Sequence, residues 1–204
     1  MNAFEQGLLT YLQPEQLEKI QNVRIGIAGA GGLGSNCAVN LVRSGFRRLV
    51  IADFDTVAPS NLNRQFFFAH QIDQPKVQAL ADNLRAINDN LELTLHPVLI
   101  TRENIHTLFA ECAIVVEAFD QVGAKQLLIE ELSCSGKLLV AASGLAGWQN
   151  SDAIQTHKLG EKFYLIGDLQ TAIGPGRPPL SPRVQIAAAK QANVILNYVL
   201  TVAD

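Results

Sequence analysis

Residues 23–34 read VRIGIAGAGGLG, and this stretch decides the fold class of the chain. The β-branched, apolar run 23–28 predicts a buried strand, and a glycine turn over 29–34 then leads into a helix over 35–44. The glycines match the pattern G-x-G-x-x-G, in which glycine lets the backbone approach phosphate and the helix N-terminus favours anions. They are Gly29, Gly31, Gly32 and Gly34. The stretch therefore predicts a nucleotide-binding turn, with a purely structural tight turn as the alternative.

The rest of the chain alternates strands and helices in the same way. Further strands are expected over 49–52, 91–99, 114–118 and 138–142, and further helices over 8–20, 76–88, 123–133 and 184–202. Pro14 marks a helix start within the first of these helices. Short apolar strands separated by helices predict an α/β, Rossmann-like fold with a mostly parallel sheet and helices on both faces.

A length of 204 residues suits one domain. We expect a single domain over 1–204, made of an N-terminal helix in 1–22, a nucleotide-binding core over 23–147 and a short C-terminal extension over 148–204. Prolines and glycines gather in residues 168–183, which predicts a loop before the closing helix.

Composition excludes several function classes. Charged residues make up 17% of the chain and the net charge is −3, with no run of three Lys or Arg, so nucleic-acid binding is not expected. No apolar run reaches the length of a bilayer span and residues 1–21 lack a signal-peptide core, which predicts a cytoplasmic protein that does not bind membranes. The cysteines, Cys37, Cys112 and Cys134, form no Cys-x-x-Cys pair, so no structural zinc is expected.

A second stretch, the polar DFDTVAPSNLNRQ over residues 53–65, indicates which nucleotide binds. Asp53 lies 19 residues beyond Gly34, at the end of the second strand, where an acid can bind ribose hydroxyls. An NAD-dependent dehydrogenase has no need for the acids, amides and arginine that follow. Because the carboxyl ends of adjacent parallel strands share one crevice, Asp53, Asp55, Arg64 and Asp120 are expected to converge on one nucleotide.

This set suits adenylation of a carboxylate by ATP. Arg64 and Lys76 can screen the triphosphate and the departing pyrophosphate, and Asp120 can hold Mg²⁺ through one or two contacts. A C-terminal carboxylate has a pKa of about 3.3–3.7, so the nucleophile is already ionised at pH 7 and no general base is required.

The same residues carry a family resemblance over about residues 21–147. GAGGLGSN, DFDTVAPSNLNRQ, QPK and the aspartate of EAFDQ resemble the adenylating-enzyme superfamily that includes ThiF, MoeB and the ubiquitin-activating enzymes. GLAGWQNSD and PPLSPRVQIAAAKQA are similar to the compact ThiF-like subgroup.

The resemblance implies a role for each site residue. Asp53 would bind ribose, Arg64 and Lys76 the phosphates, and Asp120 the Mg²⁺ ion, while Asn61 and Gln65 line the same site. It also implies a homodimer that activates a ThiS-like, ubiquitin-like sulfur-carrier protein ending in Gly-Gly, with thiamine biosynthesis as the expected pathway.

The sequence departs from the superfamily in places. Many relatives carry an N-terminal arginine that reaches the partner's ATP, but the first arginine here is Arg24, inside the first strand. Relatives often read Thr-Asp-Asn where this chain has Phe119-Asp120-Gln121. Relatives that form a thioester or persulfide place a cysteine in a loop after the core, but no cysteine follows Cys134 here, so the resemblance implies that the chemistry stops at the acyl-adenylate.

Three other functions remain open at this stage. They are an NAD-dependent oxidoreductase, a non-catalytic binding module that resembles the ubiquitin-activating (E1) enzymes, and a ligase that acts on a peptide or on modified tRNA.

Overall fold

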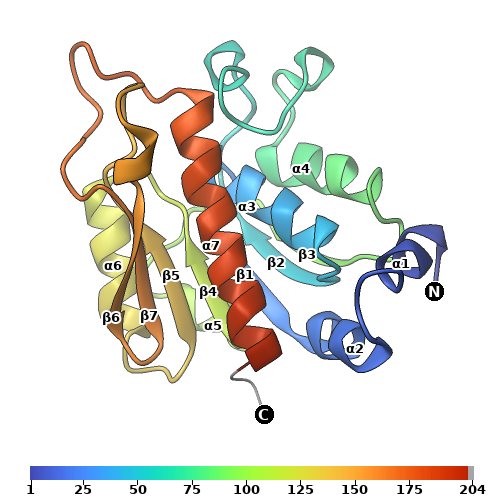
Figure 1. Ribbon diagram of the computed structural model, residues 1–204. Coiled ribbons are helices and arrows are strands. Elements are labelled where there is room, and N and C mark those ends of the chain that lie inside the picture. The colour runs from blue at the N-terminus through green and yellow to red at the C-terminus, as the bar shows by residue number, and fades with distance from the viewer. Residues whose placement is uncertain (202–204) are drawn as a thin grey trace.

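A seven-stranded sheet forms the centre of the molecule (Figure 1). The structure is a computed structural model, and it describes residues 1–201. The strand order is β3-β2-β1-β4-β5-β7-β6, and all neighbouring strands are parallel except β7 and β6. The strands are β1 (Arg24–Ala28), β2 (Arg48–Ala52), β3 (Glu92–His96), β4 (Ile114–Glu117), β5 (Leu138–Ala142), β6 (Gln155–Gly160) and β7 (Phe163–Gly167). This arrangement confirms the predicted Rossmann-like α/β fold.

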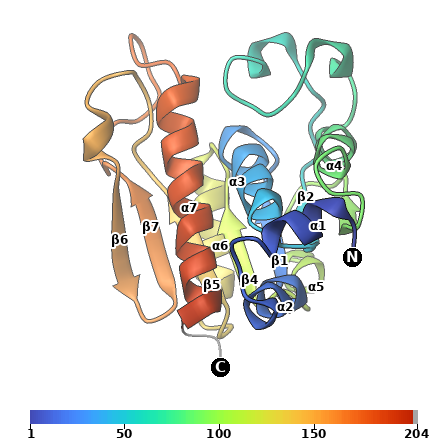
Figure 2. The same cartoon turned by 45° about the vertical axis from the view of Figure 1, so that its right-hand side comes forward.

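Helices cover both faces of the sheet. They are α1 (Ala3–Leu8), α2 (Pro14–Asn22), α3 (Gly32–Arg43), α4 (Lys76–Arg85), α5 (Ile105–Leu108), α6 (Val122–Leu132) and α7 (Ser181–Thr201). Short 3-10 turns span η1 (Pro59–Asn61), η2 (Ala69–Gln71) and η3 (Ser151–Ala153). Helices α3 and α7 lie side by side over one face, whereas α5 and α6 lie behind the sheet (Figures 1 and 2).

Two apolar cores follow from this layering, because successive side chains of a strand point to opposite faces. Ile25 and Ile27 of β1 belong to the larger core, under α3 and α7. On the other face, a methyl group added at Gly26 would lie 2.5 Å from the ring of Phe109. Gly26 therefore lets that buried ring pack directly on the strand.

The N-terminal segment differs from the expected single helix over 8–20. Its first helix, α1, is capped by Asn2, whose side-chain oxygen accepts the N–H of Glu5 at 3.0 Å. The chain then turns, and Pro14 occupies the first position of α2. Proline fits there because it has no N–H to leave unpaired and its backbone is already set for a helix.

The C-terminal extension contains an element that the sequence pattern did not predict. Strands β6 and β7 form an antiparallel hairpin, and β7 also pairs in parallel with β5. Strand β6 reads QTHKLG and is mostly exposed, so it lacks the alternation of apolar and polar residues that marks a half-buried strand. The closing helix α7 begins at Ser181, three residues before the expected start, and the last expected helical residue, Val202, lies outside the described residues.

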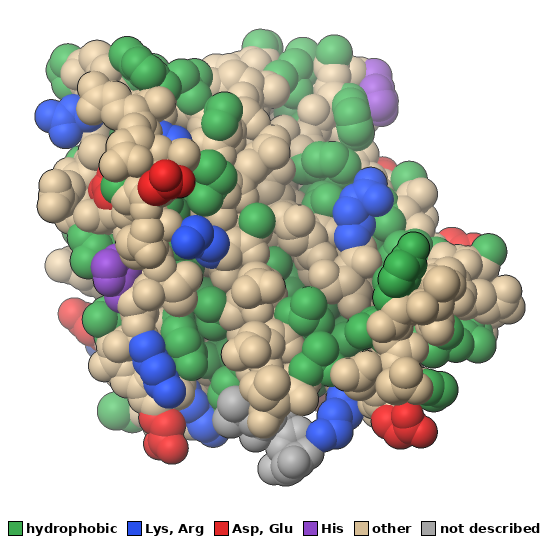
Figure 3. Space-filling model, in the orientation of Figure 1, with side chains coloured by type: hydrophobic (Ala, Val, Ile, Leu, Met, Phe, Trp, Pro, Cys, Tyr) green, Lys and Arg blue, Asp and Glu red, His purple; other side chains and the backbone are tan. Residues whose placement is uncertain are grey.

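Two loop segments rise above the carboxyl edge of the sheet. Residues 53–75 follow β2, and residues 168–180 lead into α7; both lie at the top of the molecule in Figures 1 and 2. On the face covered by α7, Lys and Arg side chains are scattered over the surface (Figure 3). Among residues 1–201, no helix has both the length and the apolar character needed to cross a bilayer.

Candidate functional site

The glycine turn joins β1 to α3 through close backbone contacts. Gly29 has a φ of +99°, and a methyl group there would meet the carbonyl oxygen of Ala118 at 3.0 Å. A methyl group at Gly34 would lie 1.8 Å from the carbonyl oxygen of Gly29. Only glycine, which has no side chain, allows the first helical turn of α3 to lie this close to the Gly29 carbonyl. This packing leaves the N-terminus of α3 at the carboxyl edge of the sheet.

Asp53 ties the end of β2 to this turn. One carboxylate oxygen accepts the N–H of Ala30 at 2.6 Å, and the other accepts the N–H of Asp55 at 2.8 Å. Only 9% of Asp53 is exposed. Burial raises the pKa of its carboxyl, although the two backbone hydrogen bonds and the charge of Lys76 oppose that shift. The acid expected at the ribose position is therefore fixed against the glycine turn.

Lys76 and Asp55 form an ion pair beside Asp53. The ammonium nitrogen lies 2.6 Å from Asp55 Oδ2, and the Lys76 side chain is 7% exposed. The backbone N–H of Lys76 also donates to the carbonyl of Asp55 at 2.9 Å. These contacts hold a positive charge at the start of α4, within reach of the end of β2.

The SNLNRQ segment is shaped by its own hydrogen bonds. The Asn61 side chain accepts the N–H of Ala58 at 2.9 Å, and the Asn61 carbonyl accepts the N–H groups of Arg64 and Gln65 at 3.1 and 2.9 Å. Asn61 thus builds the turn that carries the next two site residues, in addition to any contact with a ligand.

Arg64 and Gln65 both face the glycine turn. A methyl group at Gly32 would lie 3.5 Å from Arg64 Cγ, and one at Gly31 would lie 3.8 Å from Gln65 Nε2. Gln65 is buried, and its Oε1 has no hydrogen-bond partner. An unpaired buried acceptor is costly and would be relieved by a donor from a bound molecule.

Asn36 of α3 links the glycine turn to the SNLNRQ segment, and no sequence motif had indicated this link. Its side-chain amide donates to the carbonyls of Gly32 and Arg64, at 2.7 and 2.8 Å. The only signal was its position in GAGGLGSN, one turn into the helix after the glycines.

Asp120 lies in the turn between β4 and α6 and is exposed. Next to it, Glu117 is buried and accepts the N–H of Phe119 at 2.7 Å. Lys125 reaches the Glu117 carboxylate at 2.9 Å and the carbonyl of Ala142 at 2.9 Å. Burial raises the pKa of the Glu117 carboxyl, and the charge of Lys125 opposes that shift. This pair, which fixes the turn that carries Asp120, was also missed; its signal was an acid at the end of the apolar run 114–117.

The expected site residues thus gather along the carboxyl ends of β1, β2 and β4. Those around the glycine turn contact it or one another directly, whereas Asp120 enters from the neighbouring strand end without a hydrogen bond to them. Among residues 1–201, no three His, Cys, Asp or Glu side chains come together as a metal site. Backbone N–H groups, two cations and the buried acid Asp53 in this arrangement can hold a phosphorylated ribonucleotide.

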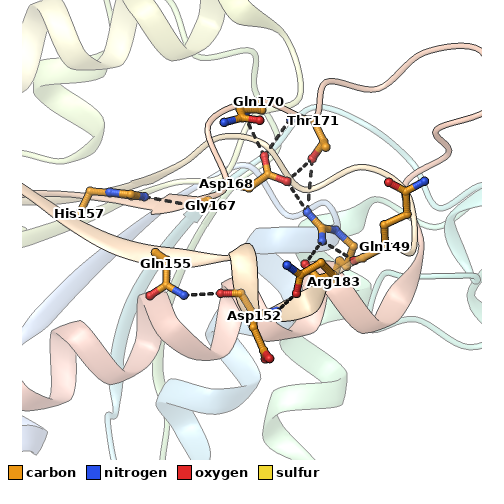
Figure 4. A network of polar contacts seen from close by, with 10 residues as sticks. Gln149, Asp152, Gln155, His157, Gly167, Asp168, Gln170, Thr171 and Arg183 are labelled. Carbon is orange, nitrogen blue, oxygen red and sulfur yellow. Dashed lines mark hydrogen bonds and ion pairs between the residues drawn. The ribbon is translucent and has the colours of Figure 1, made fainter.

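A second polar network lies in the C-terminal extension (Figure 4). The buried Arg183 guanidinium donates to Asp168 Oδ2 at 2.5 Å and to the carbonyls of Gln149 and Asn150 at 2.6 and 2.7 Å. Asp168 also accepts the hydroxyl of Thr171 at 2.6 Å. This network joins three segments of the extension at the start of α7, and nothing in the sequence pattern had pointed to it.

The family model described as the ThiF family matches residues 5–162. The chain belongs to the ThiF family. Among curated relatives, it is 36% identical over 118 residues to the sulfur carrier protein ThiS adenylyltransferase of Bacillus subtilis, covering 56% of this chain and 35% of the relative. It is 31% identical over 143 residues to SUMO-activating enzyme subunit 2 of Dictyostelium discoideum, covering 69% of this chain and 22% of that protein.

Solved structures with the same fold are more distant in sequence. This ThiF-family chain superposes on the Escherichia coli tRNA N6-threonylcarbamoyladenosine dehydratase TcdA in complex with AMP, with a TM-score of 0.88 and 20% identity over 97% of this chain and 94% of that one. The Escherichia coli MccB structure with ATP gives a TM-score of 0.73 and 18% identity over 97% and 64%. The chain spans 22% of the length of the Dictyostelium relative and 50% of that of the Thermus thermophilus sulfur carrier protein adenylyltransferase, so it covers no more than half of these curated relatives.

Proposed function

We propose that this ThiF-family protein uses ATP to adenylate the C-terminal carboxylate of a ubiquitin-like sulfur-carrier protein. The observation that carries the proposal is that Arg64 lies against the glycine turn while Lys76 lies beside Asp53, the acid that the turn holds through the N–H of Ala30. Hydride transfer develops no charge on phosphate, so dinucleotide redox chemistry does not require two cations at this position. The names of the curated relatives, and the AMP and ATP complexes of proteins with the same fold, support the choice.

The proposed binding mode follows the geometry. The ribose hydroxyls bind Asp53, and the phosphates lie over Gly29, Gly31, Gly32 and Gly34 at the N-terminus of α3. Asp55 holds the Lys76 ammonium in place until phosphate oxygens compete for it. Gln65, whose Nε2 lies beside Gly31, offers an unpaired Oε1, and Asn61 keeps the turn in shape.

The proposed reaction needs charge stabilisation and no base. An oxygen of the carrier's ionised carboxylate attacks the α-phosphorus, and the bond from that phosphorus to the bridging oxygen breaks. The electron pair leaves with pyrophosphate, where Arg64 and Lys76 stabilise the developing charge. Asp120 fits a Mg²⁺ ion, because one exposed carboxylate leaves most of the ion's shell to water and phosphates. When bound, that ion would neutralise charge on the phosphates.

The finer features are part of the same proposal. The partner is a ThiS-like carrier ending in Gly-Gly, the pathway is thiamine biosynthesis, and the protein acts as a homodimer in the cytoplasm. The relative named as a ThiS adenylyltransferase supports this carrier over other ubiquitin-like proteins.

Two measurements test the proposal. Calorimetric titration with ATP–Mg²⁺ and with NAD should show binding of ATP alone. Exchange of labelled pyrophosphate into ATP should then require a ThiS-like carrier and vanish with a carrier whose C-terminal carboxylate is amidated. Binding of NAD without ATP would indicate an oxidoreductase, and ATP binding without exchange would favour a ligase with a different acyl substrate or a non-catalytic module.

A further inference from the structure

A short exposed arch lies within the extension, just before α7. Residues 172–178 are all exposed, and we call this segment the arch. Within it, Arg177 donates its backbone N–H to the carbonyl of Gly174 at 2.9 Å, and Gly176 has a φ of +72°. Proline followed by glycine in the left-handed region, closed by this hydrogen bond, is typical of a type II turn. The arch therefore has a preformed tip.

Both ends of the arch are anchored. At its start, Asp168 and Thr171 belong to the Arg183 network shown in Figure 4. At its end, the Gly147 N–H donates to the carbonyl of Pro178 at 2.9 Å, and the Asn63 side-chain amide donates to the carbonyl of Pro179 at 3.1 Å. Asn63 is thus a residue of the SNLNRQ segment that contacts the position directly after the arch.

The other end of the same side chain holds Arg64. Asn63 Oδ1 accepts a hydrogen bond from Arg64 Nη1 at 2.8 Å, and the carbonyl of Ser60 accepts from the same nitrogen at 3.1 Å. Guanidinium has five N–H donors in a fixed fork, so these contacts leave Nε and Nη2 for another acceptor. One planar amide thus connects the cation proposed to bind phosphate to the base of the arch.

We propose that Asn63 is a positioning residue that couples the Arg64 guanidinium to the arch, so that nucleotide binding and the placement of the arch depend on each other. This inference rests on the proposed function, because Arg64 has to contact the nucleotide. When the guanidinium turns toward phosphate, the Asn63 amide turns with it and its hydrogen bond to Pro179 changes. Coupling of this kind is reciprocal: an ordered arch favours the nucleotide-bound position of Arg64.

The chain carries its own reporter for this coupling. Trp148 is the only tryptophan and is 65% exposed. It follows Gly147, which pairs with the end of the arch, and a methyl group at Gly147 would lie 4.0 Å from Arg177 Cγ. A shift of the arch changes the surroundings of Trp148 and hence its fluorescence.

The test compares Asn63→Leu, which keeps the size of the side chain without its polar atoms, with Asn63→Gln, which restores an amide. Asn63 is exposed, so neither change disturbs the core. Asn193→Ala, at an exposed asparagine of α7, is the matched control. Without nucleotide, hydrogen exchange at the arch should be about 2–10 times faster in Asn63→Leu, the range for losing one net hydrogen bond.

With nucleotide, ATP–Mg²⁺ should change the emission of Trp148 in the wild type and in Asn193→Ala. Asn63→Leu should still bind ATP in the calorimeter but lose that emission change, and Asn63→Gln should recover part of it. Identical hydrogen-exchange rates at the arch and identical Trp148 emission changes in Asn63→Leu and the wild type would overturn the inference. So would a wild type that binds ATP with no response of Trp148 or the arch. Failure of the wild type to bind ATP would instead refute the proposed function, and the coupling with it.

Discussion

Arg64 and Lys76 are the residues on which the proposed chemistry depends. Arg64→Lys and Lys76→Met keep the bulk of each side chain but remove the planar fork or the charge. We expect pyrophosphate exchange to fall by about 10²–10³ for Lys76→Met and substantially for Arg64→Lys, because an oriented stabiliser of transition-state charge is lost.

The control for this comparison is Arg85→Ala, which removes a half-exposed arginine paired with Asp82 on α4. It should exchange pyrophosphate at the wild-type rate. Wild-type rates in Arg64→Lys and Lys76→Met as well would mean that both site cations are ordinary charged residues.

Asp168 predicts a pH dependence of stability. Burial would raise the pKa of its carboxyl, but hydrogen bonds from Thr171 and Gln170 and the charge of Arg183 outweigh burial and hold the pKa below its ordinary value. The carboxylate therefore stabilises the fold above the unfolded-state pKa of about 3.9, and this stability is lost as pH falls through the lower folded-state value.

Asp168→Asn should accordingly lower the free energy of unfolding at pH 7 by about 3–5 kcal/mol, as expected when one partner of a buried ion pair is removed. Urea denaturation at pH 7, 5 and 3 measures this, and the difference from wild type should shrink at the lowest pH. The exposed Asp152→Asn serves as control. A gap that stays constant down to pH 3 would contradict the assignment.

At the scale of single elements, the contact of α3 with the glycine turn depends on Gly34. A methyl group at Gly34 would strike the Gly29 backbone, which cannot move aside as a flexible side chain could. Gly34→Ala should therefore destabilise the protein by at least about 1–3 kcal/mol, the usual cost of overpacking.

Gly123 of α6 is the matched comparison, because a methyl group there meets no atom within 4 Å. Gly123→Ala should stabilise the protein by about 0.4–1 kcal/mol by restricting the unfolded chain. Denaturant unfolding of both variants measures the contrast. Equal stabilities would show that the α3 turn is looser than the contact at Gly34 implies.

For the whole molecule, the extension over 148–201 should unfold together with the core. Strand β7 pairs with β5, and α7 packs beside α3 on the same face of the sheet. Neither the extension nor the nucleotide-binding core therefore has a complete apolar core alone. Fluorescence of Trp148, which lies in the extension, and far-ultraviolet circular dichroism should give one coincident thermal transition. Two separate transitions would indicate two domains in place of the single one predicted.

The cysteines bear on where the chemistry ends in the whole molecule. Burial raises the pKa of Cys112 to about 11 and raises that of Cys37 further. Cys134 is exposed, but it follows the C-terminal end of α6. The opposite, N-terminal end of α6 is the one near the site. Because the thiolate is the reactive form, we expect no covalent carrier adduct.

The triple Cys→Ser variant, if circular dichroism shows it folded, should keep near wild-type pyrophosphate exchange. A non-reducing gel after incubation with carrier and ATP should show no thiol-labile band. A band that disappears when one cysteine is replaced would contradict this expectation.

The sequence by itself determined the core of the fold and the segments from which the candidate site is built. The run 23–34, the apolar strands and the SNLNRQ segment are local patterns, because a strand, a helix and a glycine turn each leave a period or a residue type within a few positions. The expected strands over 49–52, 114–118 and 138–142 appear within one residue of their predicted bounds.

Only the tertiary structure decided the rest. Strand β6 is mostly exposed and forms through pairing with β7, so its own residues carry no apolar period. The Glu117–Lys125 pair and the Arg183 network join residues 8 to 34 positions apart, while the Asn63–Pro179 contact spans 116. Side chains that satisfy one another across such separations leave no periodic signal, because their partners are brought together only by the packing of the sheet and helices around them.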